Sequence, residues 1–273
     1  MEHDSVWLGP LRGPVRWAMI GCSALTLLLC SYLILGQILG YSDAGMYEMI
    51  RPKNKPLITA TLIALTLSLL LTSIYLSDRR GSIEIEPTGP FDILSLICGR
   101  LAMIGILLTV LVMFYEVVAR YIFEKPTLWA NELSLWIAGF IFLLAGLYAM
   151  QQRSHIRIYV IYDIMPRWMQ KLADCLTVLF IWIFTICMIW GGYNEARDKI
   201  FRMETFGTAW DPPLPSTMKV GILVIISLVS IQALSNLIAD WNKEPDHHSP
   251  LDEIDETEIE NIKATLGEEP KNG

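Results

Sequence analysis

The chain has 273 residues, of which 53% are hydrophobic and 18% are charged, with a formal net charge of −7 and a mean hydropathy of +0.43. In soluble domains about a quarter of the residues are charged. Because the apolar residues here fall in long uncharged runs, the composition excludes an ordinary soluble fold and predicts an all-α integral membrane protein.

Six segments are predicted to span a membrane. A helix of about 20 apolar residues crosses a hydrocarbon layer about 30 Å thick. Five runs without a charged residue reach that length: Trp17–Ser42, Pro56–Ser77, Leu133–Gln152, Cys175–Asn194 and Val220–Ala239. A sixth run, between Asp92 and Glu116, is interrupted by Arg100. We expect this arginine to lie near a helix end and to extend towards the headgroups.

Connectors and charge divide the chain into three predicted parts. A linker with several glycines and prolines, Ser77–Phe91, separates two N-terminal helices from four later ones. We therefore expect an N-terminal extension over residues 1–92 and a four-helix core over residues 93–240. The part of the chain before Asp240 has a net charge of +1, so the acidity belongs to the C-terminal end. Residues 241–273 are predicted to be a largely disordered, solubilising tail, with docking to a partner as the alternative.

The signatures of the common enzyme classes are missing from the sequence. It has no Gly-x-x-x-x-Gly-Lys-Ser/Thr loop for ATP, no Gly-x-Ser-x-Gly and no His-Glu-x-x-His. It has no Cys-x-x-Cys pair, and no histidine lies in a predicted span to hold haem iron. We therefore expect no catalytic residue, cofactor or metal, and no enzymatic activity.

Polar residues inside the predicted spans are few and mostly uncharged. Gln37, Gln232 and Asn236 are the main ones, and hydrogen bonds between helices are sufficient to explain them. Ion-coupled carriers usually have charged residues or broken helices near the middle of the membrane. The sequence therefore favours a helical subunit that packs against another component over a complete transport pathway.

The most informative stretch joins the third and fourth predicted spans. Glu116 and Arg120 are four residues apart, so they share a helix face and can pair. Pro126 breaks the chain, Trp129 suits a membrane interface, and Glu132 lies where the next helix begins. A well-capped helical hairpin accounts for this pattern, and Arg120 is within reach of either Glu116 or Glu132.

The order of the motifs in this stretch and after it resembles the small membrane subunit, of DctQ type, of tripartite ATP-independent periplasmic (TRAP) transporters. The motifs are Arg120-Tyr121, Pro126, Trp129-Ala-Asn-Glu132, Arg153-Ser-His155-Ile156, Asp163-Ile-Met-Pro166 and Trp210-Asp-Pro-Pro-Leu-Pro215. The resemblance covers residues 93–240. The two-helix extension and the acidic tail depart from the family pattern.

The resemblance implies an accessory subunit of a secondary transporter in the bacterial inner membrane. Its partners would be a larger multi-helix permease subunit and a periplasmic solute-binding protein, with no nucleic acid involved. Transport in the family is driven by an ion gradient, typically of sodium, and the solutes are typically organic acids. The small subunit would brace the larger one. A membrane scaffold or assembly subunit without a transport role is the alternative.

Six residues are candidates for docking to the larger subunit or for a structural role. They are Glu116, Arg120, Trp129, Glu132, Arg153 and His155. For His155, an interfacial hydrogen bond is favoured over proton coupling. The Lys and Arg residues divide equally between the two sides of a six-span topology, so charge does not decide the orientation. Cytoplasmic placement of both termini is an expectation from the resemblance.

Overall fold

The computed structural model describes residues 5–42, 44–52, 55–79, 81, 84–153, 162 and 165–242. These residues form helices and turns, with no strand among them. The helices are η1 (Gly9–Leu11), α1 (Arg12–Ile38), α2 (Met46–Ile50), α3 (Pro56–Ser77), α4 (Pro90–Tyr121), α5 (Trp129–Gln151), α7 (Arg167–Phe201) and α8 (Leu214–Asp240). The predicted all-α membrane class is confirmed.

Six helices in the described part of the chain are long and apolar enough to cross a membrane: α1 together with η1, α3, α4, α5, α7 and α8. They correspond to the six predicted spans. Two of them are much longer than the uncharged runs, because charged residues occupy the ends of α4 and α7. The short helix α2 lies between the first two spans. The acidic tail, apart from its first two residues, lies outside the described residues.

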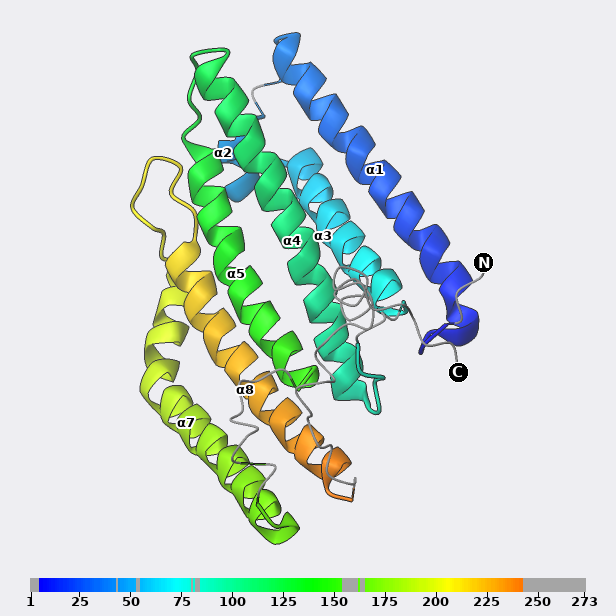
Figure 1. Cartoon of the computed structure of the whole chain (residues 1–273). Helices are drawn as coiled ribbons and strands as arrows, with labels where there is room; N and C mark the ends of the chain where they lie inside the picture. Colours follow the sequence, from blue (N-terminus) through cyan, green and yellow to red (C-terminus); the bar gives the residue numbers. More distant parts are fainter. Residues whose placement is uncertain are drawn as a thin grey trace, which may run out of the picture.

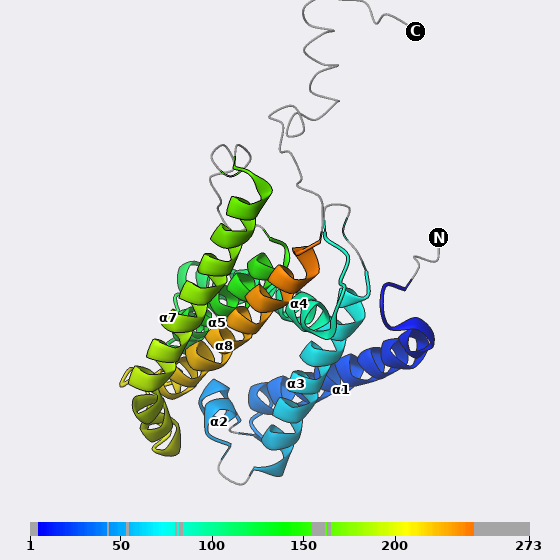
Figure 2. The ribbon, with the colours of Figure 1, turned by 90° about the horizontal axis from the view of Figure 1, so that it is seen from below.

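The helices form an extended row with the order α1, α3, α4, α5, α8, α7, in which each helix packs mainly against its neighbours (Figures 1 and 2). A contact between α4 and α8 makes α4, α5 and α8 the centre of the row. Successive spans run in opposite directions. We call the end of the molecule where α1 begins the N-terminal surface, and the other end, where α1 stops and α5 begins, the opposite surface (Figure 1).

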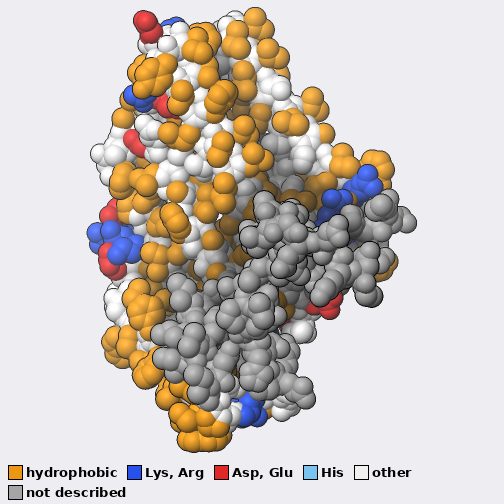
Figure 3. Space-filling view, in the orientation of Figure 1, with side chains coloured by type: hydrophobic (Ala, Val, Ile, Leu, Met, Phe, Trp, Pro, Cys, Tyr) orange, Lys and Arg blue, Asp and Glu red, His pale blue; other side chains and the backbone are white. Residues whose placement is uncertain are grey.

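Small side chains occupy many of the buried positions between the helices. Ala64, Ala102 and Ala130 are buried, whereas many large apolar side chains are exposed and cover much of the face seen in Figure 3. A β-carbon on Gly99 of α4 would lie 2.5 Å from Cδ2 of Tyr148 on α5, so this close approach requires glycine. Lipid is as apolar as a leucine side chain, so close approach and hydrogen bonds associate helices in membranes.

A buried polar network joins the three central helices. Gln232 of α8 donates to Oδ1 of Asp92 at 2.6 Å and accepts from the Ser95 hydroxyl at 3.0 Å, both on α4. Asn236 donates to the Met150 carbonyl of α5 at 2.7 Å. The interhelical bonds expected for Gln232 and Asn236 are therefore confirmed. Gln37 is exposed, and no such bond is found for it within the described ranges.

Arg100 pairs with a carboxylate, although we expected it to extend to the headgroups. Its Nη2 lies 2.5 Å from Oε2 of Glu84 and 3.0 Å from the carbonyl of Arg79, and both members of the ion pair are largely buried. The Tyr148 hydroxyl donates to the other Glu84 oxygen at 2.7 Å. Burial raises the pKa of Glu84, but the Gly81 N–H and the Arg100 guanidinium outweigh it, so the pKa lies below its ordinary value. The predicted linker is thus bonded to the core.

Candidate partner-facing site

The hairpin between α4 and α5 is fastened by one buried carboxylate. Glu116 is 2% exposed and accepts from Nε of Arg120 at 3.0 Å, with a second contact from the Arg120 Nη2. Its other oxygen accepts from the backbone N–H of Thr127 at 3.0 Å and from the Thr127 hydroxyl. Glu116 therefore connects the last turn of α4 to the residues that lead into α5. The predicted pairing of Glu116 with Arg120 is present.

The turn of this hairpin has a defined conformation. Glu124 adopts a left-handed conformation with φ of 53°, and the N–H of Lys125 donates to the Ala119 carbonyl at 2.9 Å, which closes the end of α4. Trp129 stacks on Tyr115 with 5.6 Å between ring centroids and 27° between ring planes. The two aromatic rings therefore pack the start of α5 against the end of α4.

Glu132 bonds to a distant loop and forms no ion pair with Arg120. It accepts from the Thr208 hydroxyl at 2.7 Å and from the Asp211 N–H at 3.1 Å. Both belong to residues 202–213, which we call the α7–α8 loop. Of the two carboxylates within reach of Arg120 in the sequence, only Glu116 pairs with it. The reason is geometric, because Glu116 lies one helical turn before Arg120, whereas the loop donors surround Glu132.

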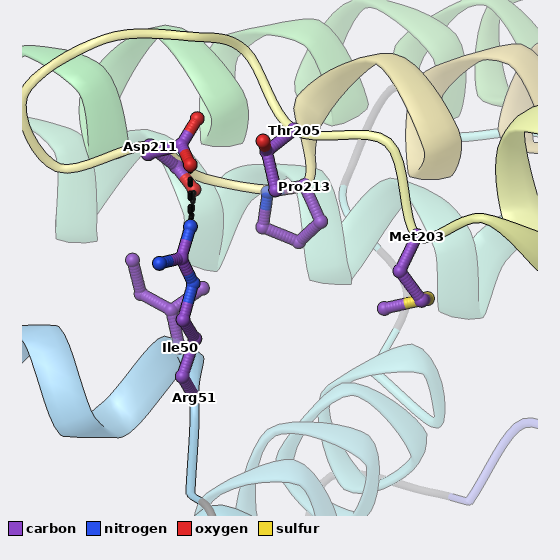
Figure 4. Close-up of a pocket in the computed structure, with 6 residues that line it drawn as sticks. All are labelled: Ile50, Arg51, Met203, Thr205, Asp211 and Pro213. Carbon is purple, nitrogen blue, oxygen red and sulfur yellow. Dashed lines mark hydrogen bonds and ion pairs between the residues drawn. The ribbon is translucent and has the colours of Figure 1, made fainter.

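A second set of contacts joins the α7–α8 loop to α2. Arg51 forms an ion pair with Asp211, drawn in Figure 4, and Nε1 of the buried Trp210 donates to the Met46 carbonyl at 3.0 Å. The Gly207 N–H, 2.7 Å from Asp211, and the Arg51 guanidinium keep the pKa of this carboxyl below its ordinary value despite partial burial. The loop is therefore held from α5 on one side and from the N-terminal extension on the other.

The α7–α8 loop borders a small cavity of about 110 Å³ (Figure 4). The residues that line it are Ile50, Arg51, Met203, Thr205, Asp211 and Pro213. Ligand pockets usually measure about 300–1,000 Å³. The cavity is below that range, and its main charged groups, Arg51 and Asp211, pair with each other, so it is a poor candidate for a substrate site.

The remaining predicted residues are remote from the hairpin. Arg153, with φ of 54°, follows α5 at the N-terminal surface and contacts both carboxylate oxygens of Asp240 at 2.5 and 2.9 Å. It therefore ties the end of α5 to the end of α8, across the membrane from Glu116. His155 lies outside the described residues. The described part of the chain contains no cluster of three His, Cys, Asp or Glu side chains able to hold a metal.

Several residues that organise these contacts are not among the predicted candidates. Glu84, Tyr148 and Asp211 are the main examples, together with Asp92 in the centre of the row. A signal existed for Glu84, because Arg100 interrupts an apolar run, and pairing with a carboxylate is an alternative to extension towards the headgroups. Asp211 lies in the Trp210–Pro215 motif of the resemblance, but no pattern in the sequence indicated its partner Arg51, which is 160 residues away.

The comparisons with known proteins concern the part of the chain that carries the hairpin and the loop. A model of the family described as tripartite ATP-independent periplasmic transporters, DctQ component, matches residues 109–243. Through this region the chain belongs to the DctQ family. The match begins within α4 and continues to the end of α8, so the hairpin and the α7–α8 loop lie in the DctQ region. Helices α1 to α3 lie outside it.

A curated relative agrees with this assignment. The chain is similar to the C4-dicarboxylate TRAP transporter small permease protein DctQ of Vibrio cholerae serotype O1, with 23% identity over 141 residues. The similarity covers 52% of this chain and 53% of the relative, so the chain spans about half the length of the curated relative that it matches. No solved structure matches the chain. DctQ proteins are transporter subunits, and the six spans agree with a multi-pass inner-membrane protein.

Proposed function

We propose that the chain is the small accessory subunit of a binding-protein-dependent secondary transporter. In this proposal it braces a larger permease subunit. The permease takes up an organic acid that a periplasmic solute-binding protein delivers, and a sodium gradient drives the uptake. The match of residues 109–243 to the DctQ family carries the proposal. The uncharged centre of α4, Leu101–Tyr115, supports it, because a helix that carries ions usually has polar or charged groups there.

The hairpin between α4 and α5 is the proposed docking element at the opposite surface. Glu116, Arg120 and Trp129 fix its turn, and Glu132 joins it to the α7–α8 loop. A rigid, hydrogen-bonded loop loses little conformational entropy when a partner binds. Arg153 is assigned a structural role at the N-terminal surface, where it holds α5 to α8. His155, two residues later in the sequence, is assigned a structural role as well.

A row of exposed side chains along α4 is the proposed docking face within the membrane. Its residues follow each other at alternating spacings of four and three, the spacing at which helices pack side by side. We call this row the α4 stripe: Met103, Leu107, Val110, Phe114, Val117 and Tyr121. The occupant that we assign to it is a long helix of the large permease subunit, since the stripe leads directly to the hairpin.

Co-purification of the large subunit tests the docking role. We expect Arg120→Ala and Glu132→Ala to lose most of the co-purified permease and most of the uptake, while the chain still inserts in the membrane. Arg197→Ala, at an exposed arginine of α7 near the same surface and outside the α7–α8 loop, is the matched control and is expected to behave as wild type. Normal complex yield and normal uptake in both hairpin variants would contradict the docking role and leave the hairpin a purely structural turn.

The α4 stripe has its own matched pair of variants. Phe114 and Phe180 are similarly exposed, at 67% and 64%, on α4 and α7. We expect Phe114→Ala to weaken retention of the large subunit and Phe180→Ala to leave it unchanged. Equal retention by the two variants would assign the α4 stripe to lipid contact.

Uptake by proteoliposomes tests the function as a whole. We expect uptake of a C4-dicarboxylate or another organic acid, driven by a sodium gradient, only when the chain is combined with the large permease and the binding protein. The chain alone is expected to give none. Uptake by the chain alone would contradict an accessory role, and full uptake by the other two components would favour a scaffold or assembly subunit.

The orientation and the division of the chain also belong to this proposal. We propose cytoplasmic termini, an extension over residues 1–92, a DctQ-type core over residues 93–240 and an acidic tail after it. Reporter fusions after Gly273 and within Tyr41–Lys55 should then report opposite sides of the membrane. Both reporters on one side would overturn this topology.

A further inference from the structure

The N-terminal surface of the α1–α3 pair carries three arginines, two of which contact the same tyrosine. The guanidinium carbons of Arg12 and Arg79 lie 5.9 and 5.7 Å from the ring centroid of Tyr75. Arg16 follows Arg12 by four residues on α1 and therefore lies on the same helix face. Arg16 and Arg79 are both exposed. We call Arg12, Arg16 and Arg79 the arginine cluster.

The carboxylate beside this cluster is already occupied. Asp78 is fully buried and accepts from the N–H groups of Trp7 and Leu8, both at 2.9 Å, and Arg12 lies 3.4 Å from it. Burial raises the pKa of Asp78, but the two N–H groups and Arg12 outweigh it, so the pKa lies below its ordinary value. Within the described ranges, no carboxylate pairs with Arg16 or Arg79. Two cationic groups therefore remain available to an outside anion.

Exposed apolar side chains lie next to the arginine cluster on the membrane side. Trp17 and Ile20 of α1 are 73% and 41% exposed, and Leu70 of α3 is 42% exposed. Figure 3 shows blue Lys and Arg side chains beside orange apolar ones at the right-hand edge, where Figure 1 places the beginning of α1. Tryptophan favours the headgroup level of a bilayer. The surface therefore combines cations at headgroup level with an apolar face for acyl chains.

We propose that this surface binds an anionic phospholipid. The headgroup phosphate contacts Arg16 and Arg79, and the acyl chains lie along α1 and α3. Guanidinium groups bind phosphate through two parallel hydrogen bonds, and basic pockets between membrane helices bind anionic headgroups. Arg12 positions the cluster by its contacts with Asp78 and Tyr75. The site lies in the extension, outside the DctQ region, and does not depend on the transport function.

The test uses the full chain, delipidated in mild detergent. Phosphatidylglycerol is added back, and both its retention and the melting temperature of the chain are measured. We expect Arg16→Gln and Arg79→Gln each to weaken phosphatidylglycerol binding about fivefold, because a juxtamembrane arginine contributes about that factor to attraction by an anionic lipid. Arg16→Lys and Arg79→Lys should retain part of the affinity, since they keep the charge but lose the paired hydrogen bonds.

Three controls separate the proposal from its alternatives. The Arg197→Gln/Arg202→Gln double variant removes two exposed arginines from the opposite surface and should bind phosphatidylglycerol as wild type does. Phosphatidylcholine should give less stabilisation, and inorganic phosphate should not displace the lipid. Equal retention by wild type and by the Arg16→Gln/Arg79→Gln double variant would overturn the proposal. An equal loss in the control double variant, or equal stabilisation by phosphatidylcholine, would also overturn it.

Discussion

The centre of the row and the α1–α3 pair are held together in different ways. The centre has side-chain hydrogen bonds at several depths, including Gln232 to Asp92 at 2.6 Å and Trp136 to Thr217 at 2.8 Å. Between α1 and α3 the described residues have one such bond within the spans, between the Ser23 and Ser68 hydroxyls at 2.9 Å. The centre is therefore joined through the membrane, whereas the pair is joined mainly at its ends.

The extension is also attached to the later helices by polar contacts at its two ends. At the N-terminal surface, Glu84 of the linker pairs with Arg100, and at the opposite surface Arg51 pairs with Asp211. Lipid provides no hydrophobic driving force between helices, so polar bonds have large effects on where helices associate. The extension is therefore fastened at both membrane surfaces, and the variants below test the two kinds of joint separately.

The largest effect is expected from Arg100→Met. It removes the Arg100 guanidinium from the buried Glu84 carboxylate, and removal of one member of a buried ion pair costs about 3–5 kcal/mol. Thermal unfolding of the purified chain in detergent measures the loss. The Glu84→Gln/Arg100→Met double variant should recover part of it, because both charges of this pair are then removed. A melting temperature of Arg100→Met equal to that of wild type would mean that the joint at the N-terminal surface does not stabilise the chain.

Gly99→Ala is expected to rank second, through close packing in the centre. The new β-carbon meets the Tyr148 ring, and overpacking of this kind costs about 1–3 kcal/mol. Gly146→Ala on α5 is the matched control, because a β-carbon there has no atom within 4 Å. The control should be neutral or slightly stabilising, since alanine favours helix over glycine. Equal melting temperatures of the two variants would contradict the close α4–α5 contact.

A pair of hydrogen-bond deletions compares the two regions directly. Gln232→Leu leaves Asp92 and Ser95 buried without this partner, which is expected to cost about 1–3 kcal/mol. Ser23→Ala removes the bond to Ser68 and is expected to cost about 0.6 kcal/mol, the average for such bonds in membranes. Chemical unfolding in mixed micelles gives both values. An equal or larger loss in Ser23→Ala would reverse the comparison.

The smallest expected effect is a pH dependence of stability that comes from the Glu84 and Asp211 ion pairs at the two surfaces. Glu84 and Asp211 have folded-state pKa values below the ordinary range, so each contributes stability that is present above its unfolded pKa. This contribution is lost as the pH falls through the lowered folded-state pKa. Melting temperatures should therefore decline on acidification below the ordinary carboxyl range. Glu84→Gln should reduce the decline, and an unchanged decline would exclude Glu84 as a cause.

The sequence predicted the features that depend on residues close together along the chain. The six spans follow from uncharged runs, and the Glu116–Arg120 pair follows from helical spacing. The partner of Glu132 was not predictable, because Thr208 lies 76 residues later and approaches only when α8 packs beside α5. Arg100 illustrates an intermediate case. Its interruption of the apolar run was visible and was interpreted as extension towards the headgroups, but the folding back of the linker that brings Glu84 to it was not visible.

Helices α1 and α3 occupy one edge of the row and run in opposite directions (Figure 1). A pair of antiparallel spans returns the polypeptide to the side of the membrane from which it started. Helix α4 therefore begins at the same surface as α1, the surface at which it would also begin if α1 and α3 were absent. Adding or removing this pair changes the number of membrane crossings by two. Each later loop therefore faces the same side of the membrane with or without the pair.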